Sequence, residues 1–395
     1  MTVGTAPTWL LDPQVTFLNH GSFGSCPRQV LDHQAAIREQ LEREPVLFLA
    51  RELPGRLAAA RLRLGRFVGA RADDLAFVTN ASAAVGAVLA SIPWRTGDGI
   101  LLVDHAYNAC LQAARLMARR HGLTLQIARI PFPVEDPSRV TEAILDAATP
   151  ATRLALIDHV TSPTGLVLPI GEIVEELAAR GIETLVDGAH GPGMLDLDLD
   201  RLGAAWYTGN CHKWICAPKG AAFLHVRQDL QAVTRPLTIS HGAAETPAGG
   251  RRFRAEFDWM GTRDPSAWLA VPFAIDFFEN AVDGGWPAIR RANRDLALAG
   301  RRLLLDALGT AAPAPASMIG SLASIPLPPG SGAAAEGRWD PLQDRLWHAH
   351  RVEVPVFSWP DPPRRLLRLS AQLYNRLEQY RYLAEVLIRE LAREP

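Results

Sequence analysis

The sequence predicts an α/β protein: a large domain with a mostly parallel sheet covered by helices, followed by a smaller α+β domain. Over most of the chain, short runs rich in β-forming residues alternate with helical patterns, an order typical of parallel sheets. Several of these runs are apolar without alternation, as expected of strands covered on both faces. A length of 395 residues, with 48% hydrophobic and 21% charged residues, allows a sizeable core and more than one domain.

Seven runs are expected to form the strands of the large domain, at residues 75–79, 100–103, 125–130, 154–160, 184–187, 205–208 and 221–226. Helical patterns between them include residues 109–121, 138–148 and 170–181. The pattern changes near residue 264. A helical region then covers 265–308, strands are expected at 321–327, 352–358 and 366–370, and a final helix at 374–393. The prediction is therefore an N-terminal segment (1–30), a large domain (31–264) and a small C-terminal domain (265–395).

Charge and cysteine content exclude several classes of partner. The net charge of −1 gives no electrostatic reason to bind nucleic acid or an anionic membrane. The four cysteines have no paired or CxxC spacing, which fits free thiols in a reducing cytoplasm. The N-terminus lacks a basic start and an apolar run, so no signal peptide is expected. The uncharged stretch 75–94 is long enough to span a bilayer, but its polar residues favour a buried strand, turn and helix.

Lysine is almost absent from this chain. Lys213 and Lys219 are the two lysines among 41 Lys and Arg residues, so the other 39 are arginine. A lysine retained against that bias indicates amine chemistry, because only lysine can lose its proton, attack a carbonyl and form an imine. Chance retention of two lysines is the alternative interpretation.

Polar residues gather directly after the predicted strands, where parallel sheets bind their ligands. Asp187 ends one strand, and Lys213 follows the next strand along the chain. A lysine imine and a carboxylate that faces the pyridine nitrogen are the pair that pyridoxal phosphate requires, since a protonated ring accepts electrons from the substrate α-carbon. A helix-capping or turn role for Asp187 is the alternative interpretation.

Small residues follow the first strand of the sheet in TNASAAV, residues 79–85. They allow a helix N-terminus to approach a phosphate, with amide N–H groups and the Ser82 hydroxyl as donors. Asn210 and His212 could add donors to the same phosphate. Taken alone, the segment equally fits an ordinary helix cap.

Eight segments resemble pyridoxal-phosphate enzymes of fold type I, in the class V aminotransferase-like group and its isopenicillin N epimerase-like branch. They are LNHGSFGSCP (18–27), TNAS (79–82), DHAYNA (104–109), HVTSPTGLVLP (159–169), DGAHGPG (187–193), GNCHKWICAPKG (209–220), DWMGTRD (258–264) and LRLSAQLYN (367–375). They cover nearly the whole chain in family order. The resemblance implies the fold type I transferase fold, with a seven-stranded sheet, and a homodimer with shared active sites.

The resemblance also implies roles for individual residues. Lys213 would form the imine with pyridoxal 5′-phosphate, Asp187 would pair with the pyridine nitrogen, His190 would support it, and Tyr107 would stack on the ring. Ser162 would bond to the phenolic oxygen of the ring. The phosphate would be held by Ala81, Ser82, Asn210, His212 and, from the partner subunit, Thr262.

The substrate side of the site is expected to involve arginine. The resemblance assigns Arg368 to the α-carboxylate of an amino-acid substrate, a bidentate task that suits guanidinium. Asn19, His20 and Ser22 would line the mouth of the site. A surface ion pair of Arg368 is the alternative interpretation.

Cofactor and fold leave three reactions open, since pyridoxal phosphate labilises any bond at the α-carbon. The first is amino-acid epimerisation, with Lys213 on one face and Tyr107 as the second proton donor. The second is C–S β-elimination; a persulfide route is disfavoured because no cysteine follows Cys216. The third is transamination. A protein of this fold that only senses or scaffolds would need neither Lys213 nor Asp187.

Overall fold

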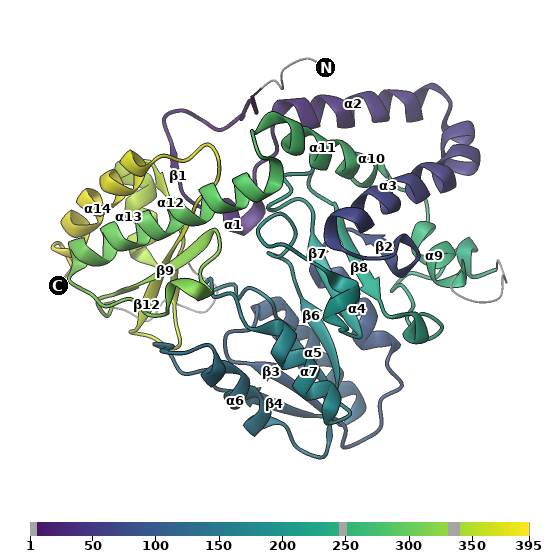
Figure 1. Cartoon of the computed structure of the whole chain (residues 1–395), viewed down its shortest axis with the longest axis horizontal. Coiled ribbons are helices and arrows are strands. Elements are labelled where there is room, and N and C mark those ends of the chain that lie inside the picture. The colour runs from purple at the N-terminus through teal and green to yellow at the C-terminus, as the bar shows by residue number, and fades with distance from the viewer. Residues whose placement is uncertain (1–5, 245–250, 331–339, 395) are drawn as a thin grey trace.

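The computed structural model describes residues 6–244, 251–330 and 340–394 (Figure 1). Its central sheet has seven strands in the order β2-β8-β7-β6-β5-β3-β4. Six strands are parallel, and β8 runs antiparallel to both of its neighbours. The predicted fold class is thereby confirmed, with strands at β2 (Leu75–Val78), β3 (Gly99–Val103), β4 (Thr124–Ala128), β5 (Thr152–Asp158), β6 (Glu183–Asp187), β7 (Trp206–Asn210) and β8 (Ala222–Val226).

Helices cover both faces of this sheet, which explains why its strands are continuously apolar. In β3, Ile100 and Leu102 face one apolar cluster, while Leu101 and Val103 face the other. The first cluster includes α4 (Ala81–Ser91), α5 (Asn108–His121) and α9 (Arg251–Asp258). The second includes α2 (Arg28–Arg43), α3 (Leu53–Val68), α6 (Ser138–Ala147) and α7 (Ile170–Ala179). A π-helical turn, Leu47–Glu52, joins α2 to α3, and the short helix α8 (Leu199–Leu202) precedes β7.

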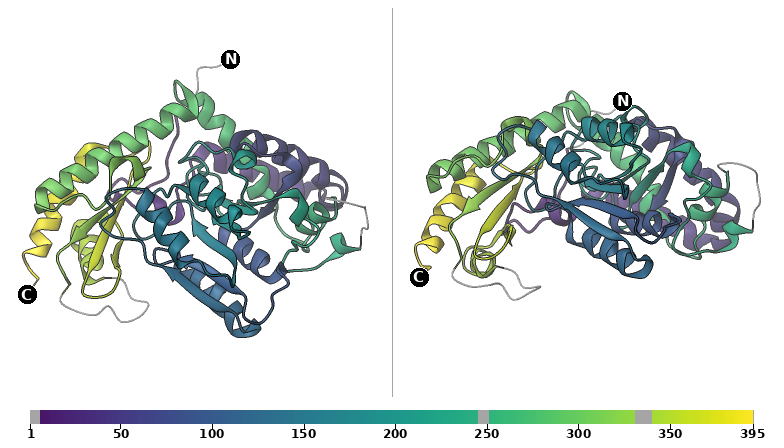
Figure 2. Two further views of the ribbon diagram at one scale, coloured as in Figure 1. Left: turned by 60° about the horizontal axis from the view of Figure 1, so that its bottom comes forward. Right: turned by 90° about the horizontal axis from the view of Figure 1, so that it is seen from below.

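A smaller α+β region lies beside the large one (Figure 2). Its antiparallel sheet has the order β11-β12-β9, formed by β9 (Leu322–Leu327), β11 (Val356–Ser358) and β12 (Arg365–Ser370). It packs with α12 (Gly285–Leu308), α13 (Pro341–His350) and α14 (Leu377–Leu391). The predicted strand 352–358 is two strands, because β10 (Val352–Glu353) pairs instead with β1 (Thr16–Phe17) of the N-terminal segment.

The N-terminal segment therefore connects the two regions. After β1 it forms the short helix α1 (His20–Phe23), directly above the carboxyl ends of the large sheet. Helices α10 (Ser266–Leu269) and α11 (Val271–Ala281) begin the predicted small domain in sequence, yet they pack against α2 and α3. The division at residue 264 stays a prediction. No helix among the described residues is long and apolar enough to cross a membrane.

Candidate active site

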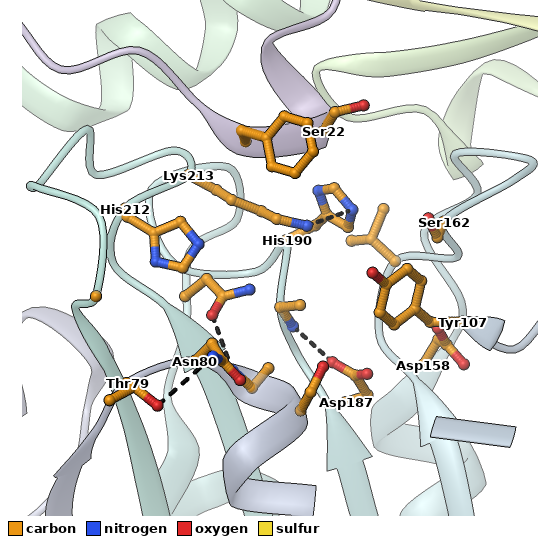
Figure 3. A pocket seen from close by; sticks show the side chains of 17 residues that line it. Ser22, Thr79, Asn80, Tyr107, Asp158, Ser162, Asp187, His190, His212 and Lys213 are labelled. Carbon is orange, nitrogen blue, oxygen red and sulfur yellow. Dashed lines mark hydrogen bonds between the residues drawn. The ribbon is translucent and has the colours of Figure 1, made fainter. Parts of the chain in front are cut away.

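A cavity of about 390 Å³ opens at the carboxyl ends of the parallel strands (Figure 3). We call it the strand-end pocket. Its walls come from the ends of β5, β6 and β7, the loops that follow these strands and β2 and β3, and the end of α1. Ten of the predicted site residues line it, namely Ser22, Ala81, Ser82, Tyr107, Ser162, Asp187, His190, Asn210, His212 and Lys213.

Glycines allow the chain to close tightly around this pocket. A Cβ atom on Gly188 would lie 2.1 Å from the Tyr207 ring, so the turn after β6 accepts only glycine there. Gly24 has φ +73°, and a Cβ atom on it would lie 2.2 Å from the carbonyl oxygen of His212. The motifs around residues 188 and 24 thus bring the β6 turn and the N-terminal segment against the lysine loop.

Lys213 lies where its amine loses its proton more easily than an ordinary lysine. Its Nζ lies 3.3 Å from Nε2 of His190, and Nδ1 of His190 accepts a hydrogen bond from the indole N–H of Trp214 at 3.2 Å. Neutral His190 then carries its proton on Nε2, which faces the lysine nitrogen. Burial, followed by the charge of Arg368, lowers the Lys213 pKa to about 8, and burial lowers that of His190 well below its usual value. An unprotonated amine is the form that attacks an aldehyde.

Asp187 lies on the floor of the pocket with both carboxylate oxygens bonded. Oδ1 accepts the backbone N–H of Ala189 at 3.0 Å, and Oδ2 accepts the thiol of Cys110, also at 3.0 Å. These two donors stabilise the ionised carboxylate and fix its orientation at the end of β6. The arrangement offers a fixed negative charge to a cationic group in the cavity.

The N-terminal end of α4 forms another wall. Asn80 caps the helix by accepting the N–H of Ala83 at 2.8 Å, and Asn210 accepts the N–H of Ala81 at 2.9 Å. The partial positive charge of this helix end, with Ser82 beside it, favours an anion such as phosphate. His212 donates Nδ1–H to the carbonyl oxygen of Ala221 at 3.0 Å, which leaves Nε2 for a ligand.

Arg368 reaches the pocket wall from β12 of the small region. It is 2% exposed, donates to the carbonyl oxygen of Ser162, and lies 3.3 Å from the hydroxyl of Ser22. Its Nε has no partner among the described residues, and it forms no ion pair with any of them. Burial lowers its pKa to about 10. A buried guanidinium without an anionic partner is costly, so the site favours an incoming carboxylate.

Three predicted site residues lie away from the cavity. His20 is fully buried behind it, with Nε2 3.0 Å from the carbonyl oxygen of Lys213 and Nδ1 2.9 Å from the Tyr374 hydroxyl. Asn19 donates to Glu353 at 2.9 Å. Thr262 is exposed and does not line this pocket. Their predicted roles at the mouth and at a partner's phosphate stay predictions.

Sequence reasoning missed Asp158 and Phe23, which also line the pocket. Asp158 ends β5 directly opposite Asp187. The signal was present in the sequence, since the predicted strand 154–160 contains one acidic residue in an apolar run. Cys110 was noted only as a free thiol, and its bond to Asp187 needs the register of α5 against β6.

Comparisons with known proteins agree with this geometry. The sequence model of the family described as aminotransferase class V matches residues 30–328. The chain belongs to the class V aminotransferase family. It is 40% identical to the isopenicillin N epimerase of Streptomyces clavuligerus over 390 residues, 96% of this chain and 95% of that protein. The isopenicillin N epimerase of Amycolatopsis lactamdurans is also 40% identical, covering 95% of each chain.

More distant relatives are named for other activities. The probable chloroplastic L-cysteine desulfhydrase of Arabidopsis thaliana is 31% identical over 95% of this chain and 83% of its own. A solved structure of the cystine C-S lyase C-DES superposes with a TM-score of 0.77 at 20% identity, covering 95% of this chain and 97% of that one. At this identity the likeness shows the fold, and it confirms the fold type I architecture.

Pyridoxal 5′-phosphate is the cofactor of the present protein, and the strand-end pocket fits it. The amine of Lys213 suits an aldehyde, the carboxylate of Asp187 suits a protonated pyridine nitrogen, and the end of α4 suits a phosphate. All three groups line one cavity, which is large enough for a small aromatic ligand.

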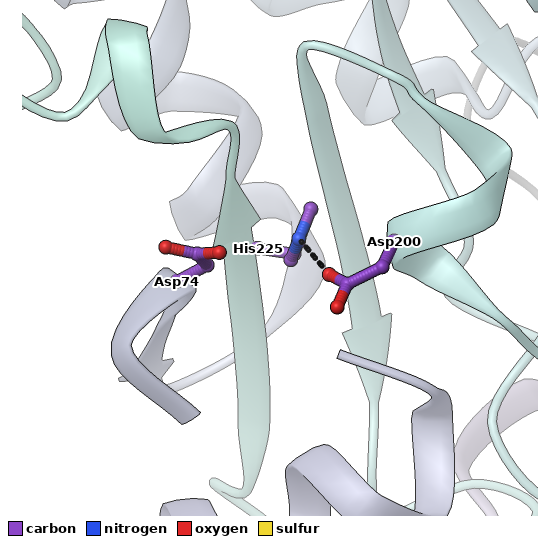
Figure 4. Close-up of side chains that lie close together, drawn as sticks. All are labelled: Asp74, Asp200 and His225. Carbon is purple, nitrogen blue, oxygen red and sulfur yellow. Dashed lines mark ion pairs between the residues drawn. The ribbon is translucent and has the colours of Figure 1, made fainter. Parts of the chain in front are cut away.

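A second group of ionisable side chains lies at the opposite, amino-terminal ends of the strands (Figure 4). Asp74, Asp200 and His225 each bring one potential ligand atom within 4.8 Å of the others. Protein partners already engage them: Gln231 donates to Asp74 at 2.7 Å, Arg71 lies 3.6 Å from Asp74, and His225 Nε2 lies 3.6 Å from Asp200. We call these three residues the amino-end cluster. The cluster links β8 and α8 to the turn that precedes β2.

Proposed function

We propose that this protein is a pyridoxal-phosphate-dependent amino-acid epimerase with chemistry like that of isopenicillin N epimerase. The observation that carries the proposal is the pairing of Lys213 and Tyr107 in one cavity, in a chain 40% identical to two such epimerases. Epimerisation needs one group that removes the α-proton and another that returns a proton on the opposite face.

The bound cofactor withdraws electrons from the α-carbon and makes its hydrogen acidic. In the proposed scheme, Lys213 Nζ takes the α-proton on one face of the substrate. The hydroxyl of Tyr107, which points into the pocket in Figure 3, delivers a proton on the other face. The reverse reaction uses the same two groups with their roles exchanged.

Arg368 is proposed to hold the substrate carboxylate. It is buried, and no ion pair between described residues includes it, so a carboxylate would supply the missing anion. Ser22 contacts the guanidinium from α1, while Asn19 and His20 would shape the mouth by supporting this helix from behind. Ser162, beside the guanidinium, would contact the phenolic oxygen of the cofactor ring.

We further propose a cytoplasmic homodimer. Thr262 is exposed and outside the strand-end pocket, so a role at a phosphate requires the pocket of a partner subunit. Reduced thiols support a cytoplasmic location: Cys26, Cys110, Cys211 and Cys216 are all free and buried.

A C–S lyase is the second candidate, favoured by the 31% identity to a probable L-cysteine desulfhydrase. Elimination needs the same α-proton removal, but the leaving group departs from the β-carbon and no second-face donor is required. A persulfide route has little support, since no cysteine follows Cys216 and burial raises the pKa of Cys26 to about 12.

Turnover of single-enantiomer amino acids in deuterium oxide separates these candidates. An epimerase yields both configurations, with deuterium at the α-carbon of the inverted product, and releases neither thiol nor keto acid. Tyr107→Phe should stop inversion while α-proton exchange with retention continues. Release of thiol and keto acid without inversion would instead identify a lyase, and exchange with retention in the parent would refute the proposal.

A further inference from the structure

Asp158 is a second buried carboxyl group on the floor of the strand-end pocket. It is 4% exposed at the end of β5, and its Cα pairs with that of Asp187 across the parallel β5–β6 ladder. Paired residues of neighbouring strands point to the same face of a sheet. Both carboxyl groups therefore face α5, and Figure 3 places both below the ring of Tyr107.

Few groups are available to balance two negative charges here. Two titratable or charged groups act on Asp158: Asp187 from β6 and Lys213 from the loop after β7. Burial and both carboxyl groups raise the pKa of the Cys110 thiol on α5. Lys213, whose pKa burial lowers to about 8, can supply at most one positive charge. Neither carboxyl group forms an ion pair with another described residue. Two adjacent buried carboxylates with at most one cation near them share a site at high cost, so one of them keeps a proton.

Hydrogen bonds decide which one is protonated. Asp187 accepts two donors, the amide of Ala189 and the thiol of Cys110. Asp158 accepts the backbone amide of Tyr107 alone from its neighbours, and burial together with the charge of Asp187 raises its pKa well above the usual value. Asp158 therefore carries the proton.

We propose that Asp158 is a positioning residue which, as the protonated member of the pair, holds Asp187 and the Tyr107 loop in place around the cofactor ring. The inference rests on the proposed roles of Asp187 and Tyr107. A protonated Asp158 adds no second charge beside the ring nitrogen, while its oxygen keeps the Tyr107 amide bonded. The Asp158 side chain would thus link Asp187, at the edge of the cofactor ring, to Tyr107, on the face of that ring.

An amide of the same shape should replace a protonated acid, whereas a methyl group should not. The test compares Asp158→Asn and Asp158→Ala with Asp104→Asn, a matched control. Asp104 also follows a strand end and accepts a backbone amide, that of Ile130 at 3.0 Å, but it does not line the pocket. Affinity is measured by titrating each apoprotein with pyridoxal 5′-phosphate, and protonation from the carboxylic-acid C=O stretch in the infrared spectrum at neutral pH.

We expect Asp158→Asn to bind the cofactor within about threefold of the parent, and Asp158→Ala to bind roughly tenfold more weakly, as for the loss of a buried hydrogen bond. The parent and Asp104→Asn should both show the protonated-carboxyl band, and Asp158→Asn should lack it. The visible absorption band of the Asn variant should keep the parent's position at neutral pH.

Equal damage from Asn and Ala would overturn the proposal, because the negative charge would then be what matters. So would an unaltered affinity in Asp158→Ala, or a parent without the infrared band. If the Ala variant does not fold, the Asn variant and the band still decide. None of these readouts involves a substrate, so they are independent of whether the enzyme epimerises, eliminates or transaminates.

Discussion

The two ends of the central sheet bury ionisable groups in opposite ways. At the amino ends, each acid of the amino-end cluster has a partner: Asp74 is bonded by Gln231 and lies near Arg71, and Asp200 pairs with His225. At the carboxyl ends, the buried Asp158, Asp187 and Arg368 and the half-buried Lys213 belong to none of the ion pairs formed between described residues.

This difference separates a structural cluster from a binding site. Charges that satisfy one another hold strands together and need no ligand. Charges that are buried but unpaired raise the free energy of the empty protein, and a ligand with complementary groups lowers it. The strand-end pocket offers an amine, a carboxylate and a guanidinium, which match an aldehyde, a pyridinium and a substrate carboxylate.

The largest effect should follow removal of the pocket amine. Lys213→Ala is expected to lower kcat by roughly 10⁴-fold or more, since it removes both the covalent attachment of the cofactor and the proposed base. Lys219→Ala is the matched control: its Nζ donates to the carbonyl oxygen of Gly24 at 2.9 Å, outside the chemistry. Turnover and borohydride trapping of the cofactor measure the effect. Trapping retained in the Lys213 variant would place the reactive amine elsewhere.

The same amine should destabilise the apoprotein at neutral pH. Burial lowers the Lys213 pKa from 10.5 to about 8. Below about pH 8 both the folded and unfolded states hold the proton, so folding bears the full cost of burying the charge, about 3 kcal/mol. Between pH 8 and 10.5 the unfolded state binds more protons, and the free energy of unfolding rises with pH.

Lys213→Met should therefore stabilise the apoprotein by up to about 3 kcal/mol at pH 7, with a difference that vanishes near pH 10.5. Denaturant unfolding at pH 7 and pH 10 measures it. A pH-independent difference between variant and parent would show that packing, and not charge, causes the effect.

Fold and site differ in how far the sequence determines them. The seven strands were predictable because each is an apolar run covered on both faces, a local signal. The split of the predicted strand 352–358 was not, because it depends on the pairing of β10 with β1 more than 300 residues earlier. Local patterns carry no information about such long-range partners.

The site shows the same division. Motifs identified Lys213 and Asp187, whose residue types are specific to one chemistry. Asp158 was missed, because a single acid in an apolar strand acquires meaning only from its neighbour in the sheet, Asp187. The unpaired state of Arg368 was equally hidden, since the sequence does not show which of the 39 arginines are buried or which of the buried ones lack an ion pair.

A smaller effect is expected at Arg368. Arg368→Lys keeps the charge but loses the planar, bidentate donor set, so kcat/KM for an amino acid should fall roughly 30-fold, mostly through KM. Cofactor affinity should change little. Arg365→Lys, in the same strand but paired with Asp340 and Glu394, is the control with a predicted effect on stability instead of KM. A fall in kcat alone would assign Arg368 to the chemistry and not to carboxylate binding.

The smallest effect should come from the amino-end cluster. His225→Asn removes a contact of 3.6 Å to the half-exposed Asp200, so it should cost about 1 kcal/mol or less in the free energy of unfolding. Cofactor affinity should equal that of the parent, because the cluster lies at the other end of the strands. Since Gln231 and Arg71 already engage Asp74, Zn²⁺ should not raise the unfolding temperature. A zinc-dependent rise in the unfolding temperature that His225→Asn abolishes would contradict this account. It would mean that both ends of the sheet are ligand-binding sites.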